Sequence, residues 1–228
     1  MRILTIILSL FYITAFAEED TVQKMAENEV KVLNSLAQQG NAGAQYKLGF
    51  FYEHGNGQVV LADPVEAVKW YRKSAEQGVA QAQYKLGYCY YHGVGVLKDP
   101  VEAVKWYHKA AEQGFVDAQL FLVRCYDDGI GVPKNSVEAD KWFRWSAEYG
   151  DVNAQYNLGR CYSVGERFTK DVVEAYAYYN LAGITLEVAR GDRDKLERTM
   201  TPSQREAGLK RSRELQVAIE ANKKAYKK

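Results

Sequence analysis

The sequence predicts an all-α fold, an α-solenoid of helix–turn–helix repeats with capping helices at both ends. The first observation is a nine-residue phrase, DPVEAVKWY, which occurs at residues 63–71 and again at residues 99–107. The second is composition: 47% apolar residues and only 4 Pro among 228 residues suit a helical globular chain. The third is an aromatic position that recurs every 36 residues, at Trp70, Trp106, Trp142 and Tyr178.

Residues 1–17 have the pattern of a secretory signal peptide. One charge, Arg2, precedes an apolar run from Ile3 to Ala17, which ends in Ala-Phe-Ala before an acidic stretch. The run is short for a membrane span, which needs about 20 apolar residues. We therefore expect an exported protein, periplasmic or secreted, with no stable membrane insertion after cleavage. Retention of this segment as an uncleaved anchor is the alternative.

Both ends of the mature chain are predicted to be caps. Residues 18–41 form an N-terminal capping helix, or half repeat, because VKVLNSLAQQG (30–40) aligns with the second half of a later unit, VKWYRKSAEQG (68–78). Residues 184–228 depart from the period and are predicted as C-terminal capping helices, the last of which opens at Pro202. A terminal repeat otherwise exposes its apolar face, so caps are expected in a solenoid.

Four repeats lie between the caps, over residues 42–183, with boundaries at about 42–79, 80–115, 116–151 and 152–183. In the first segment of a repeat, Ala, Leu and Tyr recur at i, i+4 and i+8, which is one face of a helix. Gly49, Gly87 and Gly159 stand inside these helices, where Gly costs about 1 kcal/mol relative to Ala. We therefore expect the partner helix to approach closely at these positions.

The second segment of a repeat begins at Asp-Pro and carries the recurrent Trp. Asp63 or Asp99 is expected to cap the helix, and the Pro that follows loses nothing by lacking an N–H group. The indole is expected to pack back on the first helix. The segment ends at a Gly suited to a left-handed cap, such as Gly78 or Gly114.

The segment AQAQYKLGYCYYHGVGVLKDPVEAVKWYHKAAEQG (80–114) resembles the consensus of the Sel-1-like repeats, which are related to tetratricopeptide repeats. The third repeat departs from that consensus at Leu120 and Val123, and the fourth departs from it at SVGERFTKD (163–171). The resemblance covers nearly all of the mature chain. It implies a right-handed superhelix that acts as a protein-interaction scaffold, often in secretion, envelope or signalling complexes.

Three cysteines, Cys89, Cys125 and Cys161, occupy the same place in consecutive repeats. Equivalent positions on stacked helices lie about 8–10 Å apart, which exceeds the roughly 7 Å Cα limit for a disulfide. Phe51 fills the matching place in the first repeat. We therefore interpret this position as a buried apolar slot, with a disulfide or a zinc site as the alternatives.

No catalytic, cofactor-binding or metal-binding residue is predicted. The GVGV stretch (93–96) follows a helix and lacks a Lys-Ser/Thr pair, so it is interpreted as a repeat turn and not as a phosphate loop. No triad spacing recurs around His54 or His92. The resemblance implies one enzymatic alternative, an envelope hydrolase or penicillin-binding protein of the cysteine-rich Sel-1-like type. The paired cysteines of that type are replaced here, for example by Ala82 and Ala111.

The predicted binding surface runs along the first helices at positions i, i+4 and i+7. Its residues are Tyr46, Phe50, Glu53, Tyr84, Tyr88, Tyr91, Arg124, Asp127, Tyr156 and Arg160. By resemblance to tetratricopeptide repeats they would line a concave groove, where aromatic and Arg side chains favour binding. The other interpretation is that several Tyr pack between repeats. The formal net charge of +1 falls to zero without Arg2, so we expect a protein or peptide partner and no nucleic acid.

Overall fold

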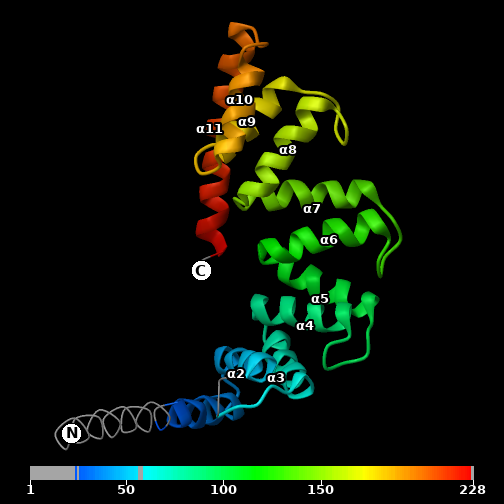
Figure 1. Ribbon diagram of the computed structural model, residues 1–228, viewed down its shortest axis with the longest axis vertical. Coiled ribbons are helices and arrows are strands. Elements are labelled where there is room, and N and C mark those ends of the chain that lie inside the picture. Colours follow the sequence, from blue (N-terminus) through cyan, green and yellow to red (C-terminus); the bar gives the residue numbers. More distant parts are fainter. Residues whose placement is uncertain (1–23, 25, 56–58, 227–228) are drawn as a thin grey trace, which may run out of the picture. The chain divides into compact units, whose positions relative to one another are not determined.

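A computed structural model describes residues 24, 26–55 and 59–226, and the predicted signal peptide, residues 1–17, lies outside this part of the chain. All regular secondary structure in the described residues is helical, as the sequence predicts (Figure 1). The chain divides within one helix into two units, Met1–Trp106 and Tyr107–Lys228.

The first unit is built from pairs of helices. A helix over residues 26–38 precedes α2 (Ala42–His54), α3 (Pro64–Glu76) and α4 (Ala80–His92), and α5 (Pro100–Glu112) spans the boundary between the units. Helix α3 packs against both α2 and α4. The core joins Leu33 and Ala37 of the first helix to Ala44, Leu48 and Trp70. The indole of Trp70 thus packs against α2, the first helix of its own repeat, as predicted.

The second unit contains α6 (Val116–Asp128), α7 (Ser136–Glu148), α8 (Val152–Val164), α9 (Val172–Ala182), α10 (Glu187–Glu197) and α11 (Pro202–Tyr226). The helices from α6 to α10 pack in consecutive order, and the long α11 returns along α9 and reaches α7 (Figure 1). The core brings Leu158 and Tyr178 together with Leu215 and Ile219 of α11. The last helix therefore covers the apolar face of the final repeat.

The predicted signals for helix ends are present in the structure. Asp63 Oδ1 accepts hydrogen bonds from the backbone N–H groups of Val65 and Glu66 at 3.0 and 3.1 Å. This carboxylate satisfies two of the N–H groups that a helix start leaves without partners. Gly78 and Gly114 follow the second helices with φ of 91° and 81°, in the left-handed region that Gly adopts without steric cost.

Two helix glycines allow an aromatic ring to approach the helix backbone. A Cβ atom on Gly49 would lie 2.7 Å from a ring carbon of Tyr71, and one on Gly159 would lie 2.6 Å from a ring carbon of Tyr179. Both distances are shorter than the 3.0 Å below which real Cβ contacts essentially never occur. At these two positions the close approach predicted from the sequence is made by the Tyr next to the recurrent aromatic position.

A buried glutamine connects each first helix to the helix before it. Its Nε2 donates a hydrogen bond to a carbonyl oxygen eight residues earlier, at 3.0–3.1 Å. That carbonyl belongs to the last turn of the preceding helix, where C=O groups lack helical partners. The residues that make this bond are Gln45, Gln83, Gln119 and Gln155.

Candidate binding surface

The ten predicted binding residues, which we call the first-helix surface, lie on α2 and α4 in the first unit and on α6 and α8 in the second. Seven of them are partly exposed, and Phe50, Arg124 and Arg160 are exposed. In the same helices Leu86 and Leu122 are fully buried. Each first helix therefore has one apolar side in the core and one side that solvent can reach.

In the first unit, Glu53 connects α2 to both α3 and α4. Its carboxylate accepts a short hydrogen bond from the hydroxyl of Tyr71 and an ion pair at 2.9 Å from Nζ of Lys85. Burial raises the pKa of Tyr71, and the hydrogen bond to Glu53 raises it further. With two donors already in place, Glu53 holds the surface together and presents little free negative charge. The helical spacing of the sequence does not single out Lys85.

In the first unit, the rest of the first-helix surface is made of aromatic rings. The ring centroids of Phe50 and His54 are 4.3 Å apart, and those of the equivalent pair, Tyr88 and His92, are 4.2 Å apart. Nζ of Lys85 stands 5.9 Å from the centroid of the Phe50 ring. The exposed part of this surface is therefore aromatic, with polar nitrogen atoms at its edges.

The other three tyrosines of this surface are half-buried. Tyr46 packs on Tyr71, with 5.9 Å between ring centroids. Tyr91 meets His92 edge-on at 4.8 Å, and Tyr84 is partly exposed on α4. Part of each ring therefore packs inside the unit, and part of it stays accessible from solvent.

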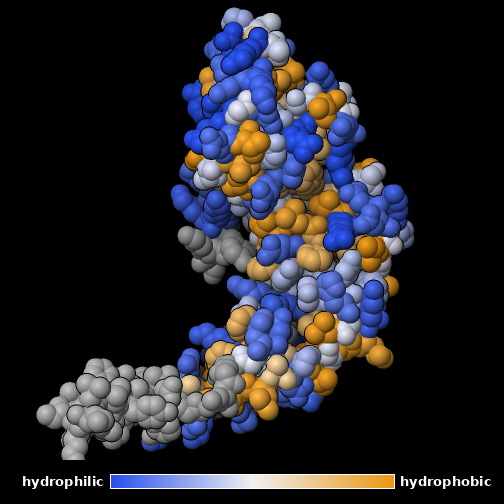
Figure 2. All heavy atoms as spheres, viewed as in Figure 1, coloured by the Kyte–Doolittle hydropathy of each residue, from blue (hydrophilic) through white to orange (hydrophobic). Residues whose placement is uncertain are grey.

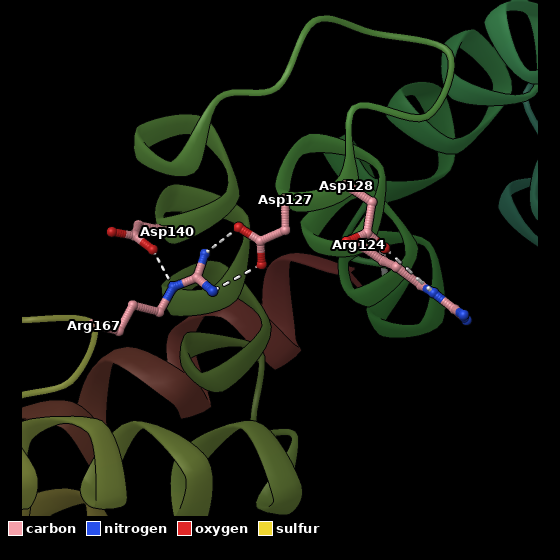
Figure 3. Close-up of polar contacts among 5 residues, drawn as sticks. All are labelled: Arg124, Asp127, Asp128, Asp140 and Arg167. Carbon is pink, nitrogen blue, oxygen red and sulfur yellow. Dashed lines mark hydrogen bonds and ion pairs between the residues drawn. The ribbon is translucent and has the colours of Figure 1, made fainter.

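In the second unit, Asp127 is bound by an arginine from the stretch where the fourth repeat departs from the consensus. The guanidinium of Arg167 donates to both carboxylate oxygens of Asp127, at 2.8 and 3.0 Å. Its Nε also donates a short hydrogen bond to Asp140, so the guanidinium lies between the two carboxylates (Figure 3). This network joins α6, α7 and the loop before α9, and it neutralises Asp127.

Arg124 points away from that network (Figure 3). Its side chain is 66% exposed, and its ion pair with Asp128 is long, at 3.9 Å. It lines a shallow pocket of about 260 Å³ together with Asp117, Leu120 and Phe121. Leu120 and Phe121 form the apolar part of this pocket, and Arg124 and Asp117 bring one charge of each sign to it.

Tyr156 and Arg160 flank an acidic group of α10. The hydroxyl of Tyr156 donates to Asp192 at 3.0 Å, and Lys195 donates to the same carboxylate at 2.9 Å. The hydrogen bond from Lys195 lowers the pKa of Asp192, and Tyr156 and the charge of Arg160 act in the same direction. Tyr156 thus connects α8 to α10, whereas Arg160 is an exposed cation.

The second helices carry a larger hollow, in which sequence reasoning placed no binding residue. Its volume is about 450 Å³, and it lies along α7 beside the last turn of α5. The lining residues are Glu112, Glu138, Lys141, Trp142, Arg144, Trp145 and Glu148. In the second unit, hydrophobic residues also gather on the visible face over α6 and α7 (Figure 2).

The cysteines are free thiols. Cys89 and Cys125 are buried and Cys161 is partly buried. Burial raises the pKa of Cys89 and of Cys125 to about 11. The apolar slot predicted from the sequence is confirmed for these two residues. A thiol with such a pKa stays protonated at neutral pH and is a poor nucleophile.

The described residues, 24, 26–55 and 59–226, contain neither a candidate metal site nor a candidate membrane span. In this part of the chain, no group of three or more His, Cys, Asp or Glu side chains is placed to hold a metal ion. None of the described helices has both the length and the apolar character that crossing a membrane requires.

Stacked helix pairs with capping helices define an α-helical repeat protein. The family model of the Sel1 repeat matches residues 42–79, 80–115, 116–151 and 152–183. This chain belongs to the Sel1 repeat family, and the predicted fold class, an α-solenoid, is confirmed. Proteins built from Sel1 repeats generally mediate protein–protein interactions and are generally not enzymes.

Two of the solved structures that are similar to this chain are bacterial proteins. A protective antigen present in uropathogenic Escherichia coli strains, which displays an SLR fold, matches with a TM-score of 0.65 and 31% identity, over 86% of this chain and 43% of its own. A Sel1 repeat protein from Oxalobacter formigenes matches with a TM-score of 0.60 and 39% identity, over 69% of this chain and 65% of its own. This chain thus spans less than two thirds of either protein. A comparison with curated proteins gave no match.

Proposed function

We propose that this protein is an exported scaffold that binds a protein or peptide partner through the first-helix surface. The observation that carries the proposal is the set of residue types at one repeat-equivalent position, which is Phe50 and Tyr88 in the first unit and Arg124 and Arg160 in the second. Aromatic and Arg side chains are the types that dominate binding energy at interfaces. They vary from repeat to repeat while the core positions stay nearly constant, as expected where the partner decides the residue.

The charges of this surface indicate what kind of partner fits. Lys85 neutralises Glu53, and Arg167 neutralises Asp127, so neither carboxylate opposes an acidic ligand. Arg124 keeps most of its charge available, because its long ion pair with Asp128 is exposed to water. We therefore propose an extended ligand with an apolar segment for the aromatic rings and an acidic segment for the arginines.

Export is part of the same proposal. It is supported by the pattern of residues 1–17, with an apolar run and a small-residue cleavage pattern. The relative from uropathogenic Escherichia coli is described as a protective antigen, which agrees with a protein that leaves the cytoplasm. We place the present chain in the periplasm or outside the cell.

Site-specific photo-crosslinking tests the binding surface. Benzoylphenylalanine would replace Phe50, Tyr88 or Arg124, one at a time, in the full chain expressed in its native cells. Matched controls would carry the same group at Lys69 or Lys105, exposed residues of the second helices with side chains 62% and 63% accessible. We expect one protein to be captured from the first-helix positions and not from the controls. Capture from the control positions alone would overturn the proposal.

The enzymatic alternative has its own test. A fluorescent penicillin acylates proteins that attack the lactam ring with an activated nucleophile. We expect no covalent label on the purified protein, and a label that survives denaturation would contradict a purely non-enzymatic role.

A further inference from the structure

The hollow along α7, which we call the Trp145 pocket, combines two indoles with several carboxylates. Trp142 and Trp145 meet edge to face, with ring centroids 5.0 Å apart and an interplanar angle of 80°. Trp142 is buried, whereas 40% of Trp145 is exposed. The pocket of about 450 Å³ therefore has an aromatic wall that a ligand can reach from solvent.

The repeats of this chain show what normally occupies the place of Trp145. The equivalent residues of the first two repeats are Lys73 and Lys109. In the first repeat, Nζ of Lys73 stands 4.2 Å from the ring centroid of Trp70 in a cation–π contact. In the third repeat an indole takes the place of that lysine. The aromatic surface is larger there, and this position no longer supplies a cation to it.

The charged residues of the pocket leave a negative balance. Glu138 pairs with Lys141 at 2.8 Å, so these two charges cancel. Arg144 and Glu148 also line the pocket, with one charge of each sign, and the Arg144 guanidinium lies 4.6 Å from the ring centroid of Phe168 in the loop before α9. Glu112 stands exposed at the last turn of α5, on the rim of the pocket. Two indoles and this carboxylate are the groups that recognise an organic cation.

We propose that the Trp145 pocket receives the side chain of a lysine or arginine from a partner polypeptide. Its charged head lies against the indoles and donates to the Glu112 carboxylate, while its aliphatic stem covers the exposed ring of Trp145. This site lies on the second helices, apart from the first-helix surface, and does not depend on the role proposed for that surface. A partner that engages it carries a basic residue in addition to any acidic segment.

Nuclear magnetic resonance of the full-length mature protein, labelled with ¹⁵N in its tryptophans, tests this site directly. The probes are the amides of N-acetylarginine and N-acetyllysine, and the uncharged controls are the amides of N-acetylcitrulline and N-acetylnorleucine. We expect the two cations to shift the indole Nε1–H signals of Trp142 and Trp145 saturably, with a Kd on the order of millimolar. The signal of Trp70 should not move, because Lys73 already occupies that ring.

Three variants sharpen the test. Trp145→Lys restores the residue type of the first two repeats and should abolish the response at Trp142. Glu112→Gln should weaken binding of the cations by about three- to tenfold, because one charge-assisted hydrogen bond is lost. Lys73→Ala is the matched control in the first unit and should leave the titration at Trp142 and Trp145 unchanged.

Several outcomes would overturn the proposal. Equal shifts with the norleucine amide would show a purely apolar site, and shifts that persist in Trp145→Lys would place the binding elsewhere. Signals of Trp142 and Trp145 that do not move with either cation would show that the pocket does not bind basic side chains. Unchanged helicity by circular dichroism and an unchanged melting temperature verify that each variant is folded.

Discussion

The three cysteines occupy equivalent positions in their repeats, but their thiols differ in how deeply they are buried and therefore in reactivity. Cys89 and Cys125 are 3% and 1% exposed, whereas Cys161 is partly exposed. Burial raises the pKa of all three thiols. Because the thiolate is the reactive form, both the depth and the raised pKa slow modification. The repeat nearest the C-terminal cap therefore carries the most reachable thiol.

We expect this difference to appear in a thiol titration. At about pH 8, a disulfide reagent of the Ellman type should react with the native protein at Cys161 first and far more slowly at Cys89 and Cys125. After denaturation it should count three thiols per chain, in agreement with the free cysteines of the structure. A count of one thiol after denaturation would show that a disulfide exists.

The burial of these cysteines was predictable from one sequence because the repeats act as an internal alignment. Phe51 fills the equivalent place in the first repeat, which indicates an apolar slot without any knowledge of the packing. The recurrent Gln119 was equally visible in that alignment. Its role was not, because the carbonyl that it binds belongs to the preceding helix, eight residues earlier. The repeat period therefore identifies a recurrent residue, but the reason why a buried recurrent residue is polar becomes clear only from the packing of the two helices.

At the scale of the helix, glycine has opposite consequences in α8 and α10. Gly159 faces the ring of Tyr179, where a Cβ atom would lie 2.6 Å from a ring carbon, whereas a Cβ atom on Gly191 would meet nothing within 4 Å. Both glycines are inside helices, where Ala is better by about 1 kcal/mol. Propensity alone therefore predicts the same gain at both positions, and packing separates them.

We expect Gly191→Ala to raise the free energy of unfolding by up to about 1 kcal/mol. Gly159→Ala should instead lower it by about 1–2 kcal/mol, because the strain of overpacking exceeds the gain in propensity. Urea denaturation followed by circular dichroism measures both changes. A stabilised Gly159→Ala variant would show that α9 can move away from α8 at no cost.

The loop before α9 contributes Arg167, whose guanidinium binds carboxylates of two helices; we call these contacts the Arg167 network. Arg167 is 26% exposed and pairs with Asp127 and Asp140, which are 32% and 25% exposed. The stretch SVGERFTKD (163–171) departs from the repeat pattern in the sequence itself. The partner of Arg167 could not be found, since Asp127 lies 40 residues earlier and belongs to another helix pair. A departure from the repeat consensus thus indicates that the contacts of this loop differ from those of the other repeats. It does not indicate which residues the loop contacts.

Replacement of Arg167 should destabilise the second unit. We expect Arg167→Met to lower the free energy of unfolding by about 1–3 kcal/mol, because two half-buried carboxylates are left without a cation. Arg124→Met is the matched control and should change it by less than about 0.5 kcal/mol, since Arg124 is exposed and its ion pair is long. Equal effects of the two substitutions in thermal or urea denaturation would mean that the network contributes nothing.

Over the whole molecule, the residues that build the fold and those that we assign to binding occupy different positions of the same repeat. The core positions hold nearly the same Ala, Leu and aromatic residues in each repeat, and for that reason the fold class was predictable from the sequence. The first-helix positions hold different residues in each repeat. The exposure of these residues followed from helical spacing. The neutralisation of their carboxylates did not, because the pairing of Glu53 with Lys85 depends on how α2 and α4 stack. The sequence therefore predicts the candidate surface, and the structure indicates which of its charges remain available.

The arginines of the second unit provide the test of this division. We expect the double substitution Arg124→Ala and Arg160→Ala to weaken binding of the crosslinked partner by about 1–3 kcal/mol, the range for charged hydrogen bonds lost at an interface. Calorimetry with the isolated partner would measure the change, and Lys69→Ala with Lys105→Ala is the matched control on the second helices. Helicity and melting temperature should hardly change, because the Arg124 side chain is 66% exposed and Arg160 is exposed as well. Unchanged binding by the arginine variant, with a loss in the lysine control, would move the interface to the second helices. A variant that melts far earlier would show instead that the arginines support the fold.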